Sequence, residues 1–416
     1  MQARAASCRT STTTARTSRG PRARGSCPRP PAAYADHVTR LLRDAPADRL
    51  LPALAAALEG TGPAVAPCGP DDEGRDAGDV PDEVALVVRT SGSTGEPRGV
   101  MLSAEALVAS VSATHQRLGG PGTWLLALPA HHVAGVQVLV RSVLAGTTPV
   151  VVPAGPFRPA AFVATTDTMP TGRRYTSLVP TQLRRLLADD AATDSLRSFD
   201  AVLLGGAATP QALLDEARAA GARVVTTYGM SETCGGCVYD GVPLSGVRVR
   251  VDDDGRVLLG GPVLATGYLG RPDLDAGSFV VVDGVRHLRT SDAGRVTDGV
   301  LTVLGRLDDV VVTGGEKVAP AAVEELLAAL PGVAEVAVVG VPDDEWGQAV
   351  VAVVVPRAGA TPPTLADVRA AATAIAPAAA PRRLEIVDHL PTRGPGKTDR
   401  RRLVADLTAH DARTTT

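Results

Sequence analysis

Lysine is almost absent from this chain. Of its 42 basic residues, all but Lys317 and Lys397 are arginine, so a lysine is an unusual choice wherever it occurs. Aromatic residues make up only 3% of the 416 residues, and the core must therefore be built mainly from valine, leucine and alanine. No apolar run reaches the roughly 20 residues that a membrane-spanning helix needs. We therefore expect no membrane segment.

An excess of charge of either sign is also missing. The formal net charge of −3 gives no electrostatic case for binding nucleic acid or an anionic membrane. The five cysteines are an odd number without the spacing of a disulfide framework, so we expect the reducing cytoplasm. The G-x-x-x-x-G-K-[ST] phosphate loop is absent as well. The length suggests two or three domains of an ordinary globular protein.

Residues 1–33 do not look like part of a folded domain. Their first 31 positions carry seven arginines, no acidic residue and many serines, threonines and prolines. An organelle transit peptide has that composition, and so does upstream sequence read from a wrong start codon. We expect a disordered or mis-started tail. Folding is expected to begin near Tyr34, with a helical pattern through Leu41, Leu42, Leu50, Leu51 and Leu54 and a connector over 60–82.

From residue 84 to about 304, apolar β-segments alternate with helical stretches. Such alternation predicts parallel sheets covered by helices, with ligands at the carboxyl ends of the strands. The expected elements include strands over 124–128, 148–152, 201–204 and 223–227, and helices over 104–118 and 211–220. From residue 241, short β-segments with Asp/Gly turns predict a small β-barrel-like subdomain.

After residues 305–309 the pattern restarts. The expected elements are strands over 310–312, 334–341 and 349–355, and helices over 319–330 and 364–375. We therefore predict an α/β protein with a large N-terminal domain of helix-covered parallel sheets over 34–304. A hinge over 305–309, a small α+β domain over 310–410 and a tail over 411–416 complete the chain.

One stretch carries the first functional signal, Thr90-Ser-Gly-Ser-Thr-Gly-Glu-Pro-Arg-Gly-Val100. It follows the apolar β-segment 85–89. Glycine lets backbone N–H groups come close to a ligand, and hydroxyl groups add further donors. A strand followed by such a loop predicts a phosphate-binding site. The alternative is a Gly/Ser surface turn.

The segment 91–100 resembles the phosphate-binding signature of the adenylate-forming, or acyl-CoA synthetase, superfamily. Five further motifs of that superfamily follow in the expected order, so the resemblance spans residues 90–397. They are Gly205-Gly-Ala-Ala208, Tyr228-Gly-Met-Ser-Glu-Thr233, Arg289-Thr-Ser-Asp-Ala-Gly294, Gly305-Arg-Leu-Asp-Asp309 and Leu390-Pro-Thr-Arg-Gly-Pro-Gly-Lys397. The resemblance implies an acyl-CoA synthetase-like fold with a mobile C-terminal domain. It also implies ATP, Mg²⁺ and coenzyme A as ligands.

The resemblance assigns a role to each motif. Glu232 would bind Mg²⁺ on ATP, and one carboxylate suffices because Mg²⁺ takes further oxygen ligands from phosphates. Asp292 would accept hydrogen bonds from the ribose hydroxyls, and Asp308 would be the pivot between the domains. The expected ATP-binding residues are Thr90, Ser91, Gly92, Ser93, Thr94, Gly95, Arg98, Gly205, Gly206, Ala207, Tyr228, Gly229, Met230, Ser231, Asp292 and Arg306.

Lys397 is the expected catalytic lysine. A compact ammonium fits between a carboxylate oxygen and the α-phosphate, where a forked guanidinium is poorly matched. The rarity of lysine supports this assignment. Arg98 replaces the lysine that is usual in the phosphate loop, and Ser291 replaces a usual glycine. Gly314 and Gly315 would offer backbone to coenzyme A, and no catalytic role is expected for Lys317.

Within the superfamily, residues 128–142, 175–182 and 231–239 most resemble the o-succinylbenzoate–CoA ligases of menaquinone biosynthesis. Their substrate carries two carboxylates, so the one that does not react needs a partner. Arg141, Arg174 and Ser177 are candidates on position alone.

Three more positions complete the expected acyl pocket, Cys234, Gly235 and Gly236. A redox or zinc role for Cys234 and Cys237 lacks a second pair or a histidine cluster, so small pocket-wall residues are the preferred interpretation. His132 aligns with a histidine near the acyl pocket and is an expected catalytic residue. A structural pair with His131 is an equally good interpretation.

Four functions follow from these residues. They are an o-succinylbenzoate–CoA ligase, a ligase for another aryl or medium-chain acid, an adenylating enzyme that loads a carrier protein, and an inactive nucleotide-binding scaffold. Arg98 and Ser291 favour the scaffold, whereas Glu232, Asp292 and Lys397 oppose it. The expected partners are a carboxylic acid, ATP and coenzyme A, without nucleic acid or membrane. A homodimer is compatible with the sequence.

Overall fold

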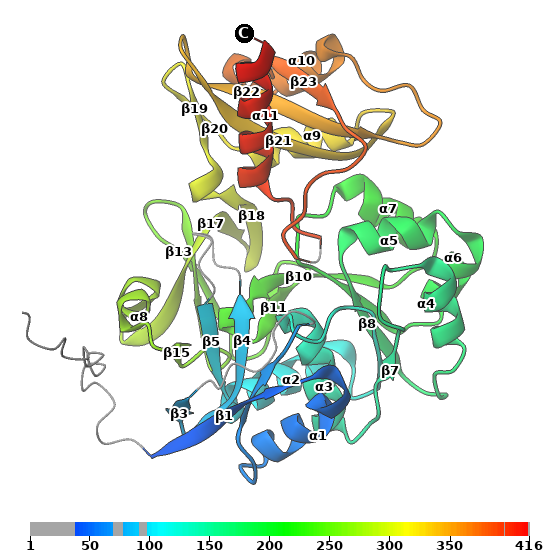
Figure 1. Cartoon of the computed structure of the whole chain (residues 1–416), viewed down its shortest axis with the longest axis vertical. Coiled ribbons are helices and arrows are strands. Elements are labelled where there is room, and N and C mark those ends of the chain that lie inside the picture. The colour runs from blue at the N-terminus through cyan, green and yellow to red at the C-terminus, as the bar shows by residue number, and fades with distance from the viewer. Residues whose placement is uncertain (1–37, 70–77, 91–97, 395, 415–416) are drawn as a thin grey trace, which may run out of the picture. The chain divides into compact units, whose positions relative to one another are not determined.

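The computed structural model describes residues 38–69, 78–90, 98–394 and 396–414 (Figure 1). The expected tail 1–33 and the phosphate-loop residues Ser91, Gly92, Ser93, Thr94 and Gly95 lie outside them. Within the described ranges, no helix has the length and apolar character needed to cross a membrane.

The first sheet has six strands in the order β15-β5-β4-β2-β1-β3. The strands are β1 (Thr39–Ala45), β2 (Ala64–Pro67), β3 (Asp79–Pro81), β4 (Val84–Thr90), β5 (Arg98–Ser103) and β15 (Gly267–Tyr268). Strands β1, β2 and β4 pair in parallel, and the others pair antiparallel. The phosphate loop therefore joins two antiparallel strands, with Thr90 opposite Arg98.

Two expectations near the N-terminus are wrong. The expected helix through Leu41 and Leu42 is strand β1, because Leu42 pairs with Ala64 of β2 and its side chain is buried in the sheet. The helix α1 (Ala47–Leu58) begins only after Pro46 and contains Leu50, Leu51 and Leu54. The expected connector over 60–82 contains β2 and β3. Short strands supported by long-range pairing leave little periodicity in the sequence.

The second sheet confirms the predicted parallel arrangement. Its order is β12-β11-β10-β9-β8-β6-β7. The strands are β6 (Thr123–Leu126), β7 (Val150–Val151), β8 (Arg174–Leu178), β9 (Ala201–Leu204), β10 (Val224–Met230), β11 (Gly235–Tyr239) and β12 (Val242–Pro243). Strands β6 to β10 pair in parallel, whereas β11 and β12 add an antiparallel edge.

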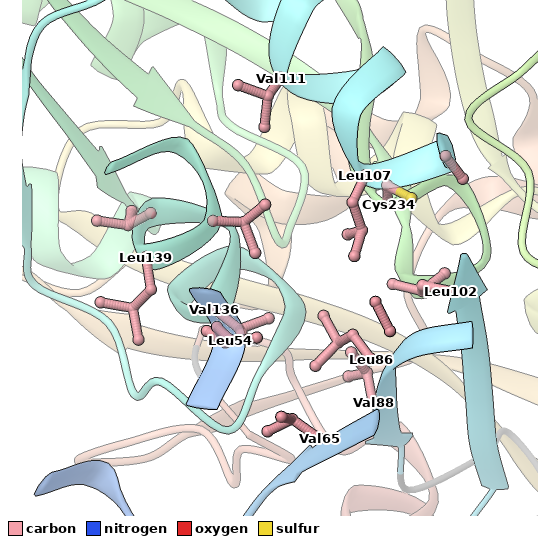
Figure 2. Close-up of a cluster of buried hydrophobic side chains, with 14 of the residues drawn as sticks. Leu54, Val65, Leu86, Val88, Leu102, Leu107, Val111, Val136, Leu139 and Cys234 are labelled. Atoms are coloured by element: carbon pink, nitrogen blue, oxygen red, sulfur yellow. The ribbon is translucent and has the colours of Figure 1, made fainter. Parts of the chain in front are cut away.

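Helices flank these two sheets. They are α2 (Ala104–Leu118), α3 (Val133–Ala145), α4 (Pro159–Thr166), α5 (Pro180–Leu187), α6 (Asp190–Arg197) and α7 (Gln211–Ala219). The α2 bounds match the prediction because Ser103 caps Ala106 N and Gly119 ends the helix with φ 86°. Residues of α1, α2 and α3 meet strand residues of both sheets in one buried core (Figure 2), which includes Leu54, Leu86, Leu107, Val136 and Leu203.

The predicted β-subdomain is a five-stranded antiparallel sheet, and no pairing closes it into a barrel within the described residues. The strands are β13 (Arg248–Val251), β14 (Arg256–Gly260), β16 (Phe279–Val282), β17 (Val285–Thr297) and β18 (Val300–Arg306). Helix α8 (Pro272–Ser278) precedes β16. The long β17–β18 pair ends at Asp292 opposite Arg306, which sets two predicted nucleotide residues side by side.

The C-terminal part has its own sheet and core. A hairpin of β19 (Val311–Thr313) and β20 (Glu316–Val318) precedes a three-stranded sheet of β21 (Val333–Asp343), β22 (Gly347–Pro356) and β23 (Arg383–Ile386). Its helices are α9 (Pro320–Ala328), α10 (Leu365–Thr373) and α11 (Arg400–Thr414). Val338 packs with α9 and α10 residues, whereas Ala337 and Val339 pack with Leu403 of α11. Successive strand residues thus bury against helices on opposite faces.

The helix α11 was not among the expected elements. It extends through Thr414 and includes residues 411–414, which were expected to form a tail.

Candidate active site

Thr90 is the last residue of β4 and Arg98 is the first residue of β5, the two strands that flank the phosphate loop. The Arg98 guanidinium lies over the Tyr268 ring, 6.0 Å from its centre. The Tyr268 hydroxyl donates a 2.8 Å hydrogen bond to Oε1 of Glu232. Burial and the Glu232 charge raise the pKa of Tyr268, so the phenol stays a donor. Tyr268 therefore connects the phosphate-loop hairpin to the predicted magnesium ligand.

Tyr268 was missed in the sequence because it belongs to none of the six motifs. Its position depends on Gly267, where a side chain would collide with the Asp275 carboxylate, since an added Cβ would lie 2.6 Å from Oδ2. Asp275 Oδ1 accepts the backbone N–H of Tyr268 at 2.7 Å. The scarcity of aromatic residues is the one signal in the sequence that could have drawn attention to this tyrosine.

Glu232 lies in a 3-10 turn (Ser231–Thr233) directly after β10. Its carbonyl accepts from Ala265 N at 2.8 Å, which fixes the turn against the β15 segment. Among the described residues, no cluster of three or more His, Cys, Asp and Glu could hold a metal ion. A lone carboxylate suits Mg²⁺ that takes its remaining ligands from phosphate and water, so the donor set fits that ion.

Asp292 of β17 faces Tyr228 of β10. The Tyr228 hydroxyl donates a 2.7 Å hydrogen bond to Oδ2 of Asp292. Burial and the Asp292 charge raise the pKa of Tyr228, so its hydroxyl also stays a donor. The bond orients the carboxylate and leaves Oδ1 for another donor. The structure thus brings together residues from the third and fourth of the six motifs.

Replacing Asp292 with asparagine is expected to raise the KM for ATP about 10- to 100-fold, because hydrogen bonds to a charged acceptor are worth about 1.5–3 kcal/mol. Steady-state kinetics with varied ATP measures this. Asp298, in the turn at the far end of the same hairpin with φ 50°, offers a matched control, since asparagine tolerates that conformation. An unchanged KM in the Asp292 variant would remove this residue from the nucleotide site.

Glycines allow close backbone approach between β9, β10 and β11. A Cβ on Gly205 would lie 2.4 Å from Thr227 Oγ1, and one on Gly229 would lie 2.1 Å from the Gly235 carbonyl oxygen. Side chains at either position would push the strand ends apart. The predicted adenine-loop residues Gly206 and Ala207 follow Gly205, which is the first residue after β9. Met230 ends β10, and Ser231 begins the turn that carries Glu232.

The hinge motif forms an ion pair, since Arg306 Nη2 lies 2.9 Å from Oδ2 of Asp308. Burial opposes ionisation of Asp308, but hydrogen bonds from the Ser291 hydroxyl and Arg306 outweigh it and lower the pKa of the carboxyl. The unusual Ser291 thus contacts the predicted pivot residue.

Lys397 lies on a short hairpin. Arg393 N donates to the Lys397 carbonyl at 2.7 Å, and Thr392 and Thr398 form a β-bridge. A Cβ on Gly396 would lie 2.8 Å from Val179 Cβ, and one on Gly394 would lie 3.6 Å from His132 Cε1. The lysine hairpin therefore rests against the carboxyl end of β8 and the start of α3.

His132 is the N-cap residue of α3, and its ring centre lies 4.3 Å from that of His131. Burial, and then the charges of His131 and Lys397, lower the pKa of His132 to about 4. His132 is therefore neutral near pH 7. His132 begins a helix, as the structural interpretation expects, and its ring lies near Gly394 of the lysine hairpin. Its catalytic role stays a prediction.

The lowered pKa predicts a pH-dependent stability. The unfolded chain binds a proton at His132 below its ordinary pKa of 6.5, whereas the folded chain does so only near pH 4. This contribution to stability is present above pH 6.5 and is lost as the pH falls toward 4. Chemical denaturation at stepped pH should show a shallower loss in His132→Gln. Parallel curves for the variant and the wild type would contradict this account.

The predicted pocket wall 234–236 lies against α3. Gln137 Nε2 donates to the Cys234 carbonyl at 2.7 Å, and Val133 and Gln137 are the nearest side chains to Gly235. Cys234 and Cys237 are free and buried. Burial raises the pKa of Cys237 to about 12 and raises the pKa of Cys234 further, so neither thiol is a nucleophile at neutral pH. The wall interpretation fits better than a redox role.

Arg141 continues the same face of α3, one turn beyond Gln137. Its side chain is buried, with 3% of its surface exposed. Its polar contacts are the Tyr239 hydroxyl at 3.4 Å and the Trp124 ring at 4.7 Å. Within the described residues, Arg141 Nε, His115 Nε2 and Trp124 Nε1 have no hydrogen-bond partner. Arg141 is therefore a buried cation that, within the described residues, has no anion paired with it, although a buried charge is usually compensated in that way.

The other two candidates for the second carboxylate lie at opposite ends of β8. Arg174 begins the strand, and its guanidinium donates to the carbonyls of Met169 and Pro170 at 2.8 and 3.0 Å. This engagement at the amino end of a parallel strand argues against Arg174 as a ligand. Ser177 is buried near the carboxyl end, two residues before Val179, and remains a candidate.

The predicted coenzyme A residues Gly314 and Gly315 form the turn between β19 and β20, with φ 58° and 83°. Gly314 N donates to the Trp346 carbonyl at 2.9 Å. Two consecutive residues with positive φ are typical of a tight hairpin turn and favour glycine. Lys317 is exposed on strand β20. Their coenzyme A role stays a prediction.

Comparison with known families decides the affiliation. The AMP-binding enzyme model matches residues 32–269, and the AMP-binding enzyme C-terminal domain model matches residues 322–397. The chain belongs to the AMP-binding enzyme family. The resemblance to the adenylate-forming superfamily and the expected fold class are therefore confirmed. This AMP-binding enzyme carries the predicted residues of all six motifs, although their individual roles stay predictions.

Curated and solved relatives narrow the comparison. A probable 2-succinylbenzoate–CoA ligase of Mycobacterium tuberculosis is 50% identical over 367 residues, covering 85% of this chain and 94% of that protein. The o-succinylbenzoate CoA synthetase of Bacillus subtilis, solved with its acyl-adenylate intermediate, is 26% identical with a TM-score of 0.67, over 85% of this chain and 80% of that one. A second structure of that synthetase, with ATP and magnesium, has a TM-score of 0.66 at 26% identity, over 85% of this chain and 82% of that one.

Proposed function

We propose that this AMP-binding enzyme is a 2-succinylbenzoate–CoA ligase of menaquinone biosynthesis. The 50% identity to the mycobacterial ligase, over nearly the whole length of that protein, is the observation that carries the proposal. The B. subtilis structures with the acyl-adenylate and with MgATP support the same chemistry. The substrates are then the acid, ATP and coenzyme A, and the site of action is the cytoplasm.

The first step is the transfer of AMP. A carboxylate oxygen of the acid bonds to the α-phosphorus of ATP while the bond to the bridging oxygen breaks and pyrophosphate leaves. Bound Mg²⁺ would supply charge neutralisation on the phosphates, with Glu232 as its protein ligand. Lys397 would place its ammonium between the acid and the α-phosphate, where negative charge develops. Asp292 and Tyr228 would hold the ribose, so that positioning and electrostatics do the catalytic work.

The second step needs a different arrangement. The coenzyme A sulfur bonds to the acyl carbon, the bond to the AMP oxygen breaks, and the thiol proton is lost to solvent. Rotation about Asp308 would withdraw Lys397 and bring Gly314 and Gly315 to the pocket. The Arg306–Asp308 ion pair and the Ser291 contact are interactions at the pivot that such a rotation would change.

We infer that Arg141 pairs with the substrate carboxylate that does not react. Its place one turn beyond Gln137 puts it on the helix face that contacts the pocket wall at Gly235. Arg141 Nε, His115 Nε2 and Trp124 Nε1 have no hydrogen-bond partner within the described residues. They provide the donors that a buried carboxylate requires. Ser177 is the second candidate, because it is buried on the strand whose carboxyl end contacts the lysine hairpin.

The test is pyrophosphate release with MgATP and a panel of acids, with and without coenzyme A. Release that is strongest with 2-succinylbenzoate, together with a coenzyme A thioester, is the expected result. A stronger reaction with another aryl or medium-chain acid would keep the chemistry and overturn the substrate. Transfer only to an added carrier protein would identify a carrier-loading enzyme. ATP binding without pyrophosphate release would identify an inactive nucleotide-binding scaffold.

A further inference from the structure

Arg400 lies three residues beyond Lys397, at the first position of α11. Its Nη1 and Nη2 donate to the two carboxylate oxygens of Glu324 in α9, at 2.6 and 2.8 Å. The guanidinium also donates to the Val338 carbonyl at 2.7 Å and lies 3.2 Å from a carboxylate oxygen of Asp309. A forked guanidinium–carboxylate pair fixes orientation as well as distance.

The partner carboxylate is itself held in place. Glu324 Oε1 also accepts the backbone N–H of Val338 at 2.7 Å, so the pair is tied to strand β21. The side chains of Arg400 and Glu324 are only 26% and 16% exposed. Burial opposes the charge on Arg400, but Glu324 and Asp309 outweigh it and raise the pKa of the guanidinium. The pair is therefore more strongly constrained than an exposed surface ion pair.

Arg400 also stands at the base of the lysine hairpin. Asp399 N donates to the Pro391 carbonyl at 2.7 Å, which closes the hairpin, and the Asp399 carboxylate caps Arg402 N at 3.1 Å. The hairpin thus passes directly into α11 at Arg400. Asp309 lies one residue past the proposed pivot Asp308. One side chain therefore connects the base of the hairpin, α9 and Asp309, the last residue of the predicted hinge.

We propose that Arg400 is a positioning residue, which holds the Lys397 hairpin rigidly to α9 and to Asp309. This inference rests on the proposed function, since it assumes that Lys397 acts in adenylate formation. When the C-terminal part rotates at the hinge, the Lys397 hairpin then moves with α9 as one rigid unit. Misplacing a catalytic group by about 1 Å costs on the order of 100-fold in rate, so the precision of this clamp matters for the first step. The second step does not use Lys397 and therefore does not need this precision.

The experiment measures the two half-reactions separately. Arg400→Met keeps the apolar stem and removes the fork, and is expected to slow pyrophosphate release about 10- to 100-fold. Transfer from supplied acyl-adenylate to coenzyme A should change less than about threefold, because it does not depend on Lys397. The rate of pyrophosphate release in Arg400→Lys should lie between those of the wild type and Arg400→Met, since an ammonium cannot bind both carboxylate oxygens at once. Arg402→Met is the matched control, because the Arg402 side chain is exposed and, within the described residues, its one ion pair is with Asp406 in the same helix.

A double-mutant cycle with Lys397→Ala tests the mechanism directly. If Arg400 acts through Lys397, Arg400→Met causes no further loss in the alanine background. Additive losses, or an equal fall in both half-reactions with a lower melting temperature, would show a general structural role and overturn the inference. Wild type that releases pyrophosphate with another acid but not with 2-succinylbenzoate would overturn only the proposed substrate, and the cycle is then run with that acid. Wild type that releases none with any acid would overturn both proposals.

Discussion

Replacing Lys397 with alanine is expected to slow acyl-adenylate formation about 100- to 1000-fold, the usual effect of removing a group that stabilises developing charge. The affinity for ATP should change little, because Glu232, Asp292 and the Tyr228 hydroxyl remain in place. Pyrophosphate release measures the rate, and calorimetric titration with ATP measures the affinity. Transfer from supplied acyl-adenylate to coenzyme A should persist, since the proposed rotation would withdraw the lysine in that step.

Two matched variants sharpen this prediction. Lys397→Arg keeps the charge but is expected to recover little of the rate, because the guanidinium is larger and forked. Lys317→Ala removes the other lysine of the chain, which lies exposed on β20, and should leave the adenylation rate unchanged. Full activity in Lys397→Arg would show that any positive charge suffices. The lysine would then owe its presence to something other than geometry.

Replacing Arg141 with methionine is expected to lower kcat/KM for 2-succinylbenzoate by about 100-fold, because it leaves the second carboxylate buried without a charged partner. The melting temperature should hold or rise, since the folded protein loses an uncompensated buried charge. An analogue that keeps the reacting carboxylate but lacks the second one should react equally well with variant and wild type. This selective loss separates recognition of the second carboxylate from damage to the fold.

Arg174→Met provides the control for Arg141. Its guanidinium donates to two backbone carbonyls at the opposite end of β8, so its loss should leave the discrimination between the two acids unchanged. If Arg141→Met slows both acids equally, Arg141 supports the pocket wall through Tyr239 and does not bind the substrate. Ser177 would then become the leading candidate for the second carboxylate.

Much of the fold could be predicted from local pattern. Helix 104–118 was predicted with the right bounds, because a serine cap, an amphipathic repeat and a terminal glycine all agree. The central strands of the second sheet were equally clear, since buried parallel strands are continuous apolar runs. The prediction of a helix through Leu41 and Leu42 was wrong, because these leucines fit a helical repeat. Only the pairing of β1 with β2 decides between helix and strand.

The candidate site was predictable where its residues lie within a motif. Glu232, Asp292 and Lys397 could be named because each sits in a short run with a chemical rationale. Tyr268 and Arg400 could not, because their importance lies in partners that are distant in sequence, such as Glu232 for Tyr268 and Glu324 for Arg400. The shortage of acidic partners around Arg141 is likewise a property of packing. It becomes visible only when the side chains are placed in three dimensions.

The central claim is that this chain activates 2-succinylbenzoate through an adenylate. A single-turnover reaction of enzyme, MgATP and the acid without coenzyme A, followed by mass spectrometry, tests it most directly. The account predicts an enzyme-bound 2-succinylbenzoyl-AMP and one pyrophosphate per adenylate, and conversion of the adenylate to the coenzyme A thioester when coenzyme A is added. Formation of ADP and phosphate, or of thioester without a preceding adenylate, would contradict it.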